Sequence, residues 1–390
     1  MRAISTDHSV LQWPVLLGSL ALTLLPFLLP IYAKRLGASA LGIGGLFTIA
    51  QFMLVLCRPA IGWALDRCGR KVFFVIGIAC YTGAMGLFAL ASSLTMLYLA
   101  QLVQGLSTAL IWTSAYTIAT ELAPPTQQGQ VMGSIDEYSS RGALLGIAIT
   151  LALLSWLSFS TAWHLLFLSY ALLAVGGMWL AATRIPETRP PHFVPAERQP
   201  LVWGPLARVM AIVFVSQLCL AMIRPVFWIF LQDDFTTDVR LLALAFIPDT
   251  LIDSFLPSRM GSLSDRFGRV PLIIAGLTWT GLCSLLVPAW PHLAWLIAFW
   301  SLRTLGLAMA VPPQKALVSD LTATAKRGAG YGLYTFTASL GAAIGPLLGG
   351  WLYDSVGRTI PFYLTGIVLL ASFGWVFLLL RRVSGQGNGG

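Results

Sequence analysis

The sequence is poor in charged residues and has almost no asparagine. Lys, Arg, Asp and Glu together make up 10% of its 390 residues, whereas a soluble globular domain carries about 25%. The only asparagine, Asn388, is not part of a glycosylation acceptor. The five cysteines lack pairing or metal-ligand spacing, and the chain contains no G-x-x-x-x-G-K-[ST] loop and no Ser/His/Asp cluster. We therefore expect no metal site, no cofactor, no ATP-driven pumping and no enzyme activity.

Apolar residues fill most of the chain instead. They make up 57% of it, the mean hydropathy is +0.80, and a membrane span needs about 20 mostly apolar residues. The sequence therefore predicts an all-α membrane protein with twelve transmembrane helices. The predicted spans of the first half are 11–33, 39–63, 72–91, 95–119, 130–155 and 162–183. Those of the second half are 204–231, 240–260, 271–289, 293–315, 328–352 and 360–380.

Basic residues are concentrated in alternate loops. One set of loops holds most of them: Arg67, Arg70, Lys71, Arg184, Arg189, Arg198, Arg259, Arg266, Arg269, Lys326, Arg327, Arg381 and Arg382. The opposite loops hold Lys34, Arg35, Arg240 and Arg358. Since cytoplasmic loops are enriched in Lys and Arg, this pattern predicts a multi-pass protein of the plasma or inner membrane with both termini in the cytoplasm. It also explains the net charge of +9 without a nucleic-acid partner.

The two halves of the chain share one register. The segment Gly62–Lys71 resembles Gly261–Arg269, 199 residues later. The same offset relates Glu121 to Asp320 and places four glycines on four glycines: Gly129, Gly133, Gly142 and Gly146 on Gly328, Gly332, Gly341 and Gly345. A constant offset indicates a duplicated unit, which in an apolar chain is typical of transporters built from two related bundles.

The duplication predicts the domain organisation. We expect an N-terminal six-helix bundle over 1–183, a cytoplasmic linker over 184–203, a C-terminal six-helix bundle over 204–382 and a disordered tail over 383–390. Six is an even number of spans, so the bundles run in the same direction and are related by a pseudo-two-fold axis along the membrane normal.

Four motifs resemble those of the major facilitator superfamily (MFS). Gly62–Lys71 matches its loop signature G-x-x-x-D-R-x-G-R-[RK], and Gly261–Arg269 is similar to the weaker second copy. Gly345–Gly350 resembles its Gly-Pro-rich motif, and Ile185–Thr188 resembles the usual end of span 6. The pattern is most similar to the twelve-span drug:proton antiporter group. The resemblance implies the MFS fold, alternating access, a small-molecule substrate, protons as coupling ion and a monomeric state.

The duplicated loop and the glycine motifs supply the candidate gating and packing residues. The gating candidates are Gly62, Asp66, Arg67, Gly69, Arg70, Lys71, Gly261, Asp265, Arg266, Gly268 and Arg269. We expect Asp66 to meet the positive end of span 11 and Asp265 that of span 5, closing the cytoplasmic side until the bundles rock. Alternatively, the basic residues only set topology. The helix-packing candidates are Gly142, Gly146, Gly341, Gly345, Pro346, Gly349 and Gly350.

Charges within the predicted spans are candidates for specific chemistry, because a charge at membrane depth is costly. The candidates have no charged counterpart in the other half: Glu137, Arg141, Arg224, Asp249, Asp253 and Arg303. Glu137/Arg141 and Asp249/Asp253 are i,i+4 pairs that each share a helix face. If those faces meet, Arg141 pairs with Asp249, while Glu137 and Asp253 crowd each other and favour binding a proton. The alternative is a fixed salt bridge, between halves or within one helix.

Aromatic and polar residues on the same spans form the predicted substrate cavity. These residues are Gln104, Trp112, Tyr116, Arg224, Phe227, Trp300, Arg303, Tyr331 and Tyr334. Aromatic rings with a few polar groups suit a bulky amphiphile. Arg224 and Arg303 either attract an anionic substrate or neutralise Asp249.

The sequence favours proton-coupled efflux of small amphiphilic or drug-like compounds. Uptake or exchange of an organic anion or metabolite is the alternative if Arg224 and Arg303 are unpaired. A sensor or assembly component with a transporter fold is an alternative of another class, although a static scaffold would not need gating motifs in both halves.

Overall fold

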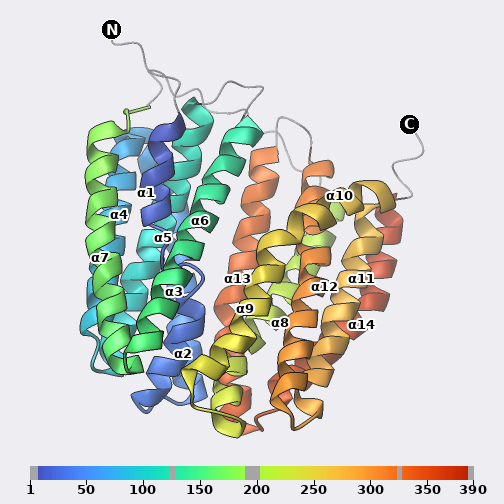
Figure 1. The fold of residues 1–390 in the computed structure, drawn as a ribbon. Helices are drawn as coiled ribbons and strands as arrows, with labels where there is room; N and C mark the ends of the chain where they lie inside the picture. Colours follow the sequence, from blue (N-terminus) through green and yellow to red (C-terminus); the bar gives the residue numbers. More distant parts are fainter. Residues whose placement is uncertain (1–7, 123–127, 189–202, 323–326, 385–390) are drawn as a thin grey trace. The chain divides into compact units, whose positions relative to one another are not determined.

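The computed structural model describes all residues except 1–7, 123–127, 189–202, 323–326 and 385–390, and the part that it describes consists of helices joined by short turns and loops (Figure 1). The first half contains η1 (His8–Leu11), α1 (Gln12–Leu17), α2 (Leu25–Arg35), α3 (Ala40–Cys68), α4 (Arg70–Leu90), α5 (Leu94–Leu122), α6 (Gln128–Trp156) and α7 (Phe159–Arg184). The second contains α8 (Trp203–Asp234), α9 (Val239–Phe255), α10 (Pro257–Phe267), α11 (Arg269–Leu286), η2 (Val287–Ala289), α12 (Leu293–Asp320), α13 (Arg327–Ser355) and α14 (Ile360–Ser384). The predicted all-α class is confirmed.

Within the described residues, nine helices are long and apolar enough to cross a membrane. Twelve spans remain a prediction. The predicted span 11–33 is divided into α1 and α2 by a turn that begins at Gly18, and the predicted span 240–260 is divided into α9 and α10 at Leu256. Proline stands in the first turn of both α2 and α10, where its missing N–H and fixed φ favour a new helix start over continuation.

The chain divides into two compact units. Unit 1 comprises residues 1–38 and 49–196, and unit 2 comprises residues 39–48 and 197–390. The first turns of α3 therefore belong to unit 2, whereas the rest of this helix belongs to unit 1. The predicted domain boundaries stay a prediction, and most of the predicted linker and tail lies outside the described residues.

Buried aromatic residues with satisfied polar groups form much of the core of unit 1. The ring of Tyr32 stacks on Trp163 with centroids 4.0 Å apart. The Tyr32 hydroxyl donates to the Ala91 carbonyl at 2.6 Å, and the Trp163 indole N–H donates to the Phe88 carbonyl at 2.8 Å. These bonds remove the cost of burying the polar end of each ring.

The duplication is visible in the packing of each unit. In unit 1, Gly77 of α4 lies against Ile111 of α5, and in unit 2 Gly276 of α11 lies against Ala310 of α12. Both contacts are related by the offset of 199 residues. Gly69 and Gly268, also related by it, begin the next helix with φ of 101° and 95°. These positive φ values favour glycine, which has no Cβ to clash with the backbone.

Glycines in α6 and α13 allow close helix contact. A Cβ on Gly142 or Gly146 would lie 2.2 or 2.0 Å from the carbonyl oxygen of Leu16 or Leu20 in unit 1. In unit 2, three glycines of α13 meet carbonyl oxygens of α8, with Cβ distances of 2.7, 2.5 and 2.0 Å: Gly341, Gly345 and Gly349. Each helix can approach its neighbour so closely only because these positions have no side chain.

We expect Gly146→Ala to destabilise unit 1 by about 1–3 kcal/mol, because the added methyl group would overlap the Leu20 carbonyl. The measurement is the apparent Tm of the purified protein in detergent. Gly86→Ala is the matched control, since nothing lies within 4 Å of a Cβ at that helical position. Equal Tm values for the two variants would contradict the packing role.

Candidate functional site

A buried arginine organises the end of unit 1 where α3 meets α4. Only 3% of Arg70 is exposed. Its Nε donates to Glu121 Oε1 at 3.0 Å and its Nη1 donates to the Leu65 carbonyl at 2.7 Å. A buried guanidinium requires such partners, because desolvation of an unpaired charge costs several kcal/mol.

The same arrangement recurs in unit 2 at the positions given by the offset. Arg269 Nε donates to Asp320 Oδ2 at 3.3 Å, and its Nη1 donates to the Ser264 hydroxyl at 2.7 Å. Arg269, at the start of α11, also pairs with Asp265 near the end of α10. In each unit, the motif arginine is thus paired with the acidic residue that the offset relates, Glu121 in unit 1 and Asp320 in unit 2.

Unit 1 adds two partners that have no equivalent in the duplicated register. Glu187 Oε1 accepts the backbone N–H of Arg70 at 2.7 Å, at the start of α4, and Thr188 donates its hydroxyl to Glu121 Oε2 at 2.5 Å. A Cβ on Gly69 would lie 2.6 Å from Glu187 Oε2. Sequence reasoning missed these contacts, although the motif Ile185–Thr188 was the available signal.

The remaining gating candidates are placed less specifically. The side chain of Asp66 lies outside the described residues, and Asp265 is exposed and paired with Arg269. Arg67 lies over the ring of Trp63 at 4.1 Å, and Arg266 lies over the ring of Phe267 at 5.7 Å. Gly62 and Gly261 have open space around them, with the nearest atom to a Gly261 Cβ at 3.9 Å, and Lys71 is half-buried.

A second cluster of candidates lies within unit 2. Asp249 of α9 accepts a hydrogen bond from the Thr304 hydroxyl of α12. Arg303, the preceding residue, is 3% exposed, and the structure records no ion pair between its guanidinium and Asp249 among the described residues. The two charges are nevertheless close enough to interact electrostatically, as are those of Asp249 and the exposed Arg224.

Aromatic rings hold the Arg303 guanidinium in place. Its central carbon lies 3.8 Å from the ring centroid of Trp300, and that ring stacks on Phe227 of α8 with centroids 3.6 Å apart and planes 4° apart. Trp228 packs edge-on against Phe227 at 5.0 Å. The result is a layered stack of one cation and two aromatic rings, which restricts the guanidinium to one orientation.

Polar atoms without partners mark equivalent positions in the two units. Arg303 Nε and the Trp300 indole nitrogen are buried without a hydrogen-bond partner in unit 2, and so is Gln104 Oε1 in unit 1. Gln104 and Arg303 are related by the offset of 199 residues. Buried unsatisfied polar atoms are rare in proteins and indicate a place for water, an ion or a ligand.

The other charged candidates are more accessible. Arg141 pairs with Glu137 on the same helix, with 2.5 Å between Nη2 and Oε1 and both side chains more than half exposed. This is the salt bridge within one helix that the sequence left open as an alternative. Asp253 is exposed, one turn from Asp249 on α9.

The four remaining aromatic candidates form two pairs, one in each unit. Trp112 and Tyr116 of α5 lie 5.7 Å apart, and the Tyr116 hydroxyl donates to Asp136 of α6. Tyr331 and Tyr334 of α13 stack at 6.2 Å; Tyr334 is buried in the core of unit 2, whereas Tyr331 is 52% exposed. Tyr334 therefore contributes to packing.

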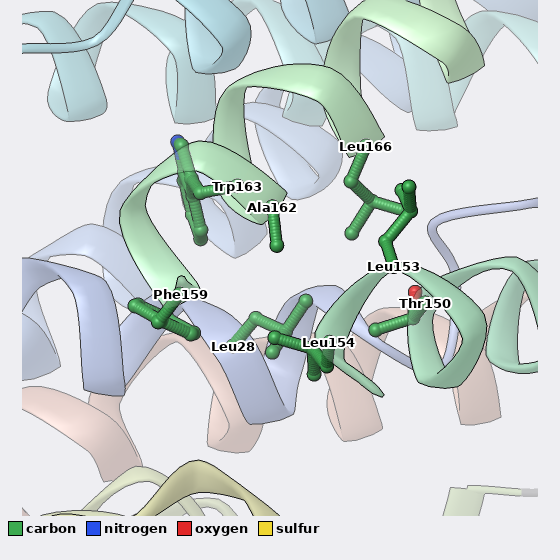
Figure 2. A pocket seen from close by; sticks show the side chains of 8 residues that line it. All are labelled: Leu28, Thr150, Leu153, Leu154, Phe159, Ala162, Trp163 and Leu166. Atoms are coloured by element: carbon green, nitrogen blue, oxygen red, sulfur yellow. The ribbon is translucent and has the colours of Figure 1, made fainter. Parts of the chain in front are cut away.

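Unit 1 also contains a small apolar pocket that includes none of the predicted site residues. Figure 2 shows Leu28 of α2, Leu154 and Thr150 of α6, and Phe159 and Trp163 of α7 around it. The Thr150 hydroxyl is bonded to the Gly146 carbonyl at 2.9 Å, so it offers the pocket little polar character.

A family model described as Major Facilitator Superfamily matches residues 15–213 and 209–389. The chain is 23% identical to Multidrug resistance protein 1 of Bacillus subtilis over 87% of both chains. It is 27% identical to the ectoine/proline transporter ProP of Corynebacterium glutamicum over 85% of this chain and 74% of the relative. Other relatives match over shorter stretches, one of them over 25% of this chain and 20% of its own length.

Solved structures share the fold. The human organic anion transporter MFSD10 superimposes with a TM-score of 0.69 at 18% identity, over 95% of this chain and 99% of that chain.

Because Arg70 is buried and Arg269 is partly exposed, we expect the two equivalent arginines to differ in their contribution to stability. Arg70→Gln should cost about 3 kcal/mol or more by leaving buried partners unpaired, and Arg269→Gln about 1 kcal/mol or less. The apparent Tm of both variants in detergent measures this difference, and Arg269→Gln is the matched control. A larger loss for Arg269→Gln would overturn the interpretation.

Proposed function

This chain belongs to the Major Facilitator Superfamily of membrane transporters, and we propose that it expels small amphiphilic compounds from the cell in exchange for protons. Members of this family are multi-pass transporters of small molecules rather than enzymes. Efflux is supported by the similarity to a protein named for multidrug resistance, while the similarity to a proline transporter is the reason that the substrate class needs a test.

The observation that carries the proposal is the Asp249 cluster. Asp249 and Arg303 have no charged counterpart in the other half, so duplication alone does not account for them. Both lie inside apolar helices, where an ionisable group is costly and is retained for function. We assign Asp249 as the carboxylate that binds the coupling proton, with Glu137, Arg141 and Asp253 as less enclosed contributors.

The charges of the cluster provide a reason for coupling. When Asp249 is ionised, its charge compensates the buried Arg303 guanidinium, and the Thr304 hydroxyl donates to it. When Asp249 is protonated, the buried Arg303 guanidinium has no compensating charge and repels a second cation. A cationic amphiphile would therefore bind the ionised state and leave on protonation, which is the requirement for exchange.

The aromatic residues supply the apolar part of the substrate site in this proposal. In unit 2, the stacked rings of Phe227 and Trp300 form an apolar wall beside Arg303. Gating by Asp66 and Asp265 at the duplicated loops, together with the topology set by the basic residues, completes the proposed cycle.

An organic anion is the second candidate substrate. Arg303 Nε is buried without a partner and Arg224 is exposed, so both could bind a carboxylate or sulfonate group. The structural similarity to an organic anion transporter is compatible with this reading but supports only the fold.

The test is the purified protein in lipid vesicles with an imposed pH gradient, scored for movement of lipophilic cations and of organic anions. We expect cation movement driven by protons, and at least a tenfold lower rate for Asp249→Asn, which carries no titratable group and no negative charge. Asp234→Asn is the control, because Asp234 pairs with Arg358 at 2.5 Å near a helix end. Anion movement with Arg303 required would instead establish the second candidate, and proton-driven cation transport by Asp249→Asn would refute the coupling role.

A separate expectation concerns the gate. Asp66→Asn should slow transport severalfold while leaving membrane insertion and the apparent Tm intact, because it removes the negative charge proposed to meet a helix start. Transport rate in vesicles and the amount of protein in the membrane fraction are the two measurements. An unchanged rate would leave the motif with a role in topology alone.

A further inference from the structure

The first turn of α3 is capped by a residue more than 300 positions away. Within unit 2, Asp354 of α13 accepts the backbone N–H groups of Ala40 and Leu41 at 3.2 and 2.7 Å. The next N–H, of Gly42, is bonded to the Ser39 hydroxyl at 3.1 Å. The first N–H groups of a helix have no intrahelical acceptor, so those of Ala40 and Leu41 depend on Asp354.

The backbones of α3 and α13 approach closely below this cap. A Cβ on Gly44 would lie 2.1 Å from the Pro346 carbonyl oxygen, and a Cβ on Gly350 would lie 2.3 Å from the Ala40 carbonyl oxygen. The Thr48 hydroxyl donates to the Ala343 carbonyl at 2.7 Å. The two helices therefore pack closely along residues 40–48 of α3. Glycine is required at Gly44 of α3 and at Gly350 of α13.

The duplicated register shows that this contact is specific to one half. Gly341 and Gly345, which pack α13 on α8, coincide with Gly142 and Gly146. The residues that meet α3 do not coincide with similar ones: Pro346, Gly350 and Asp354 fall on Ile147, Leu151 and Ser155. The glycines shared by both halves thus pack helices within each unit. The residues of α13 that contact α3 (Pro346, Gly350 and Asp354) are present in one half only.

The contact combines close fit with exposed polar groups. Asp354 is exposed, so water can replace it on the two N–H groups at little cost, in contrast to a buried ion pair. The remainder of α3 belongs to unit 1, so one continuous helix has its first turns in unit 2 and its last turns in unit 1. Motion of one unit against the other must bend α3 or release its first turns.

We propose that Asp354 is a latch: it holds residues 40–48 of α3 on α13 in one conformation of the transport cycle and releases them in the other. The latch rests on the proposed function, because only a protein with alternating conformations has use for a reversible contact. Asp354 is a positioning residue here and touches no substrate.

Labelling of a single cysteine tests the latch without any substrate. Thr48→Cys, in a background without the native cysteines, places a thiol on the covered face, about 10 Å along the helix from Leu41 at 1.5 Å per residue. We expect Asp354→Ala to increase the rate of maleimide labelling at this position at least fivefold. A residue that only capped the first turn would not affect a site two turns away.

Hydrogen exchange supplies the second readout. The amides of Ala40 and Leu41 should exchange about tenfold faster in Asp354→Ala, since charge-assisted hydrogen bonds protect them. The amide of Gly42, bonded to Ser39, is an internal reference. Gly350→Ala should have the same effect by steric overlap, whereas Gly332→Ala on the same helix, where a Cβ meets nothing within 4 Å, should not.

Two outcomes would overturn the latch. Unchanged labelling and exchange in Asp354→Ala would show that Asp354 does not hold the contact. Faster exchange with unchanged labelling would reduce it to a local helix cap. Asp234→Asn, an exposed carboxylate of the same unit that pairs with Arg358, should match the unsubstituted protein in both readouts. Because neither readout requires transport, failure of the latch is distinguishable from failure of the proposed function.

Discussion

The cost of removing a charge from water governs this structure. The chain has few charged residues, and the buried ones have specific partners. Arg70 is held by a carboxylate and a carbonyl group. Arg303 lies over an aromatic ring and interacts with the negative charge of Asp249. The first arrangement satisfies the guanidinium fully, so it stabilises one state. The second leaves Nε without a partner, so its energy depends on what else enters the cluster. Because of that difference, we assign a structural role to Arg70 and propose a functional one for Arg303.

Duplication gives a way to make the same distinction across the chain. Contacts related by the offset of 199 residues, such as Arg70–Glu121 and Arg269–Asp320, are the inherited framework of a bundle. Other contacts have no counterpart in the other half. Examples are the hydrogen bond between Asp249 and Thr304 and the cap of α3 by Asp354. Contacts that are not needed are lost as the two halves diverge. A contact that costs stability and is present in one half only is therefore expected to serve a function of that half.

The sequence predicted the helical class, the family and the register of the repeat, because each depends on composition or on local motifs. It did not predict the break after α1, since a turn between two apolar helices has no distinct hydropathy. It also missed Glu187 as the cap of α4 and Thr304 as the partner of Asp249. These partners lie on other helices or loops, and which residues meet depends on how the helices cross. The spacing of residues within one helix does not specify this.

The two kinds of contact suit opposite requirements of a transporter. The proposed proton-binding group must be enclosed, so that its charge state has a large effect on the energy of its surroundings, and the Asp249 cluster includes the buried Arg303. A contact that forms and breaks in every cycle must be inexpensive to break, and the exposed Asp354 meets that condition. A buried ion pair in place of Asp354 would trap one conformation, because several kcal/mol would be needed to separate it. In the proposed cycle, strong electrostatic interactions within the spans and weak ones at the helix ends allow a change in protonation to shift the balance between two conformations.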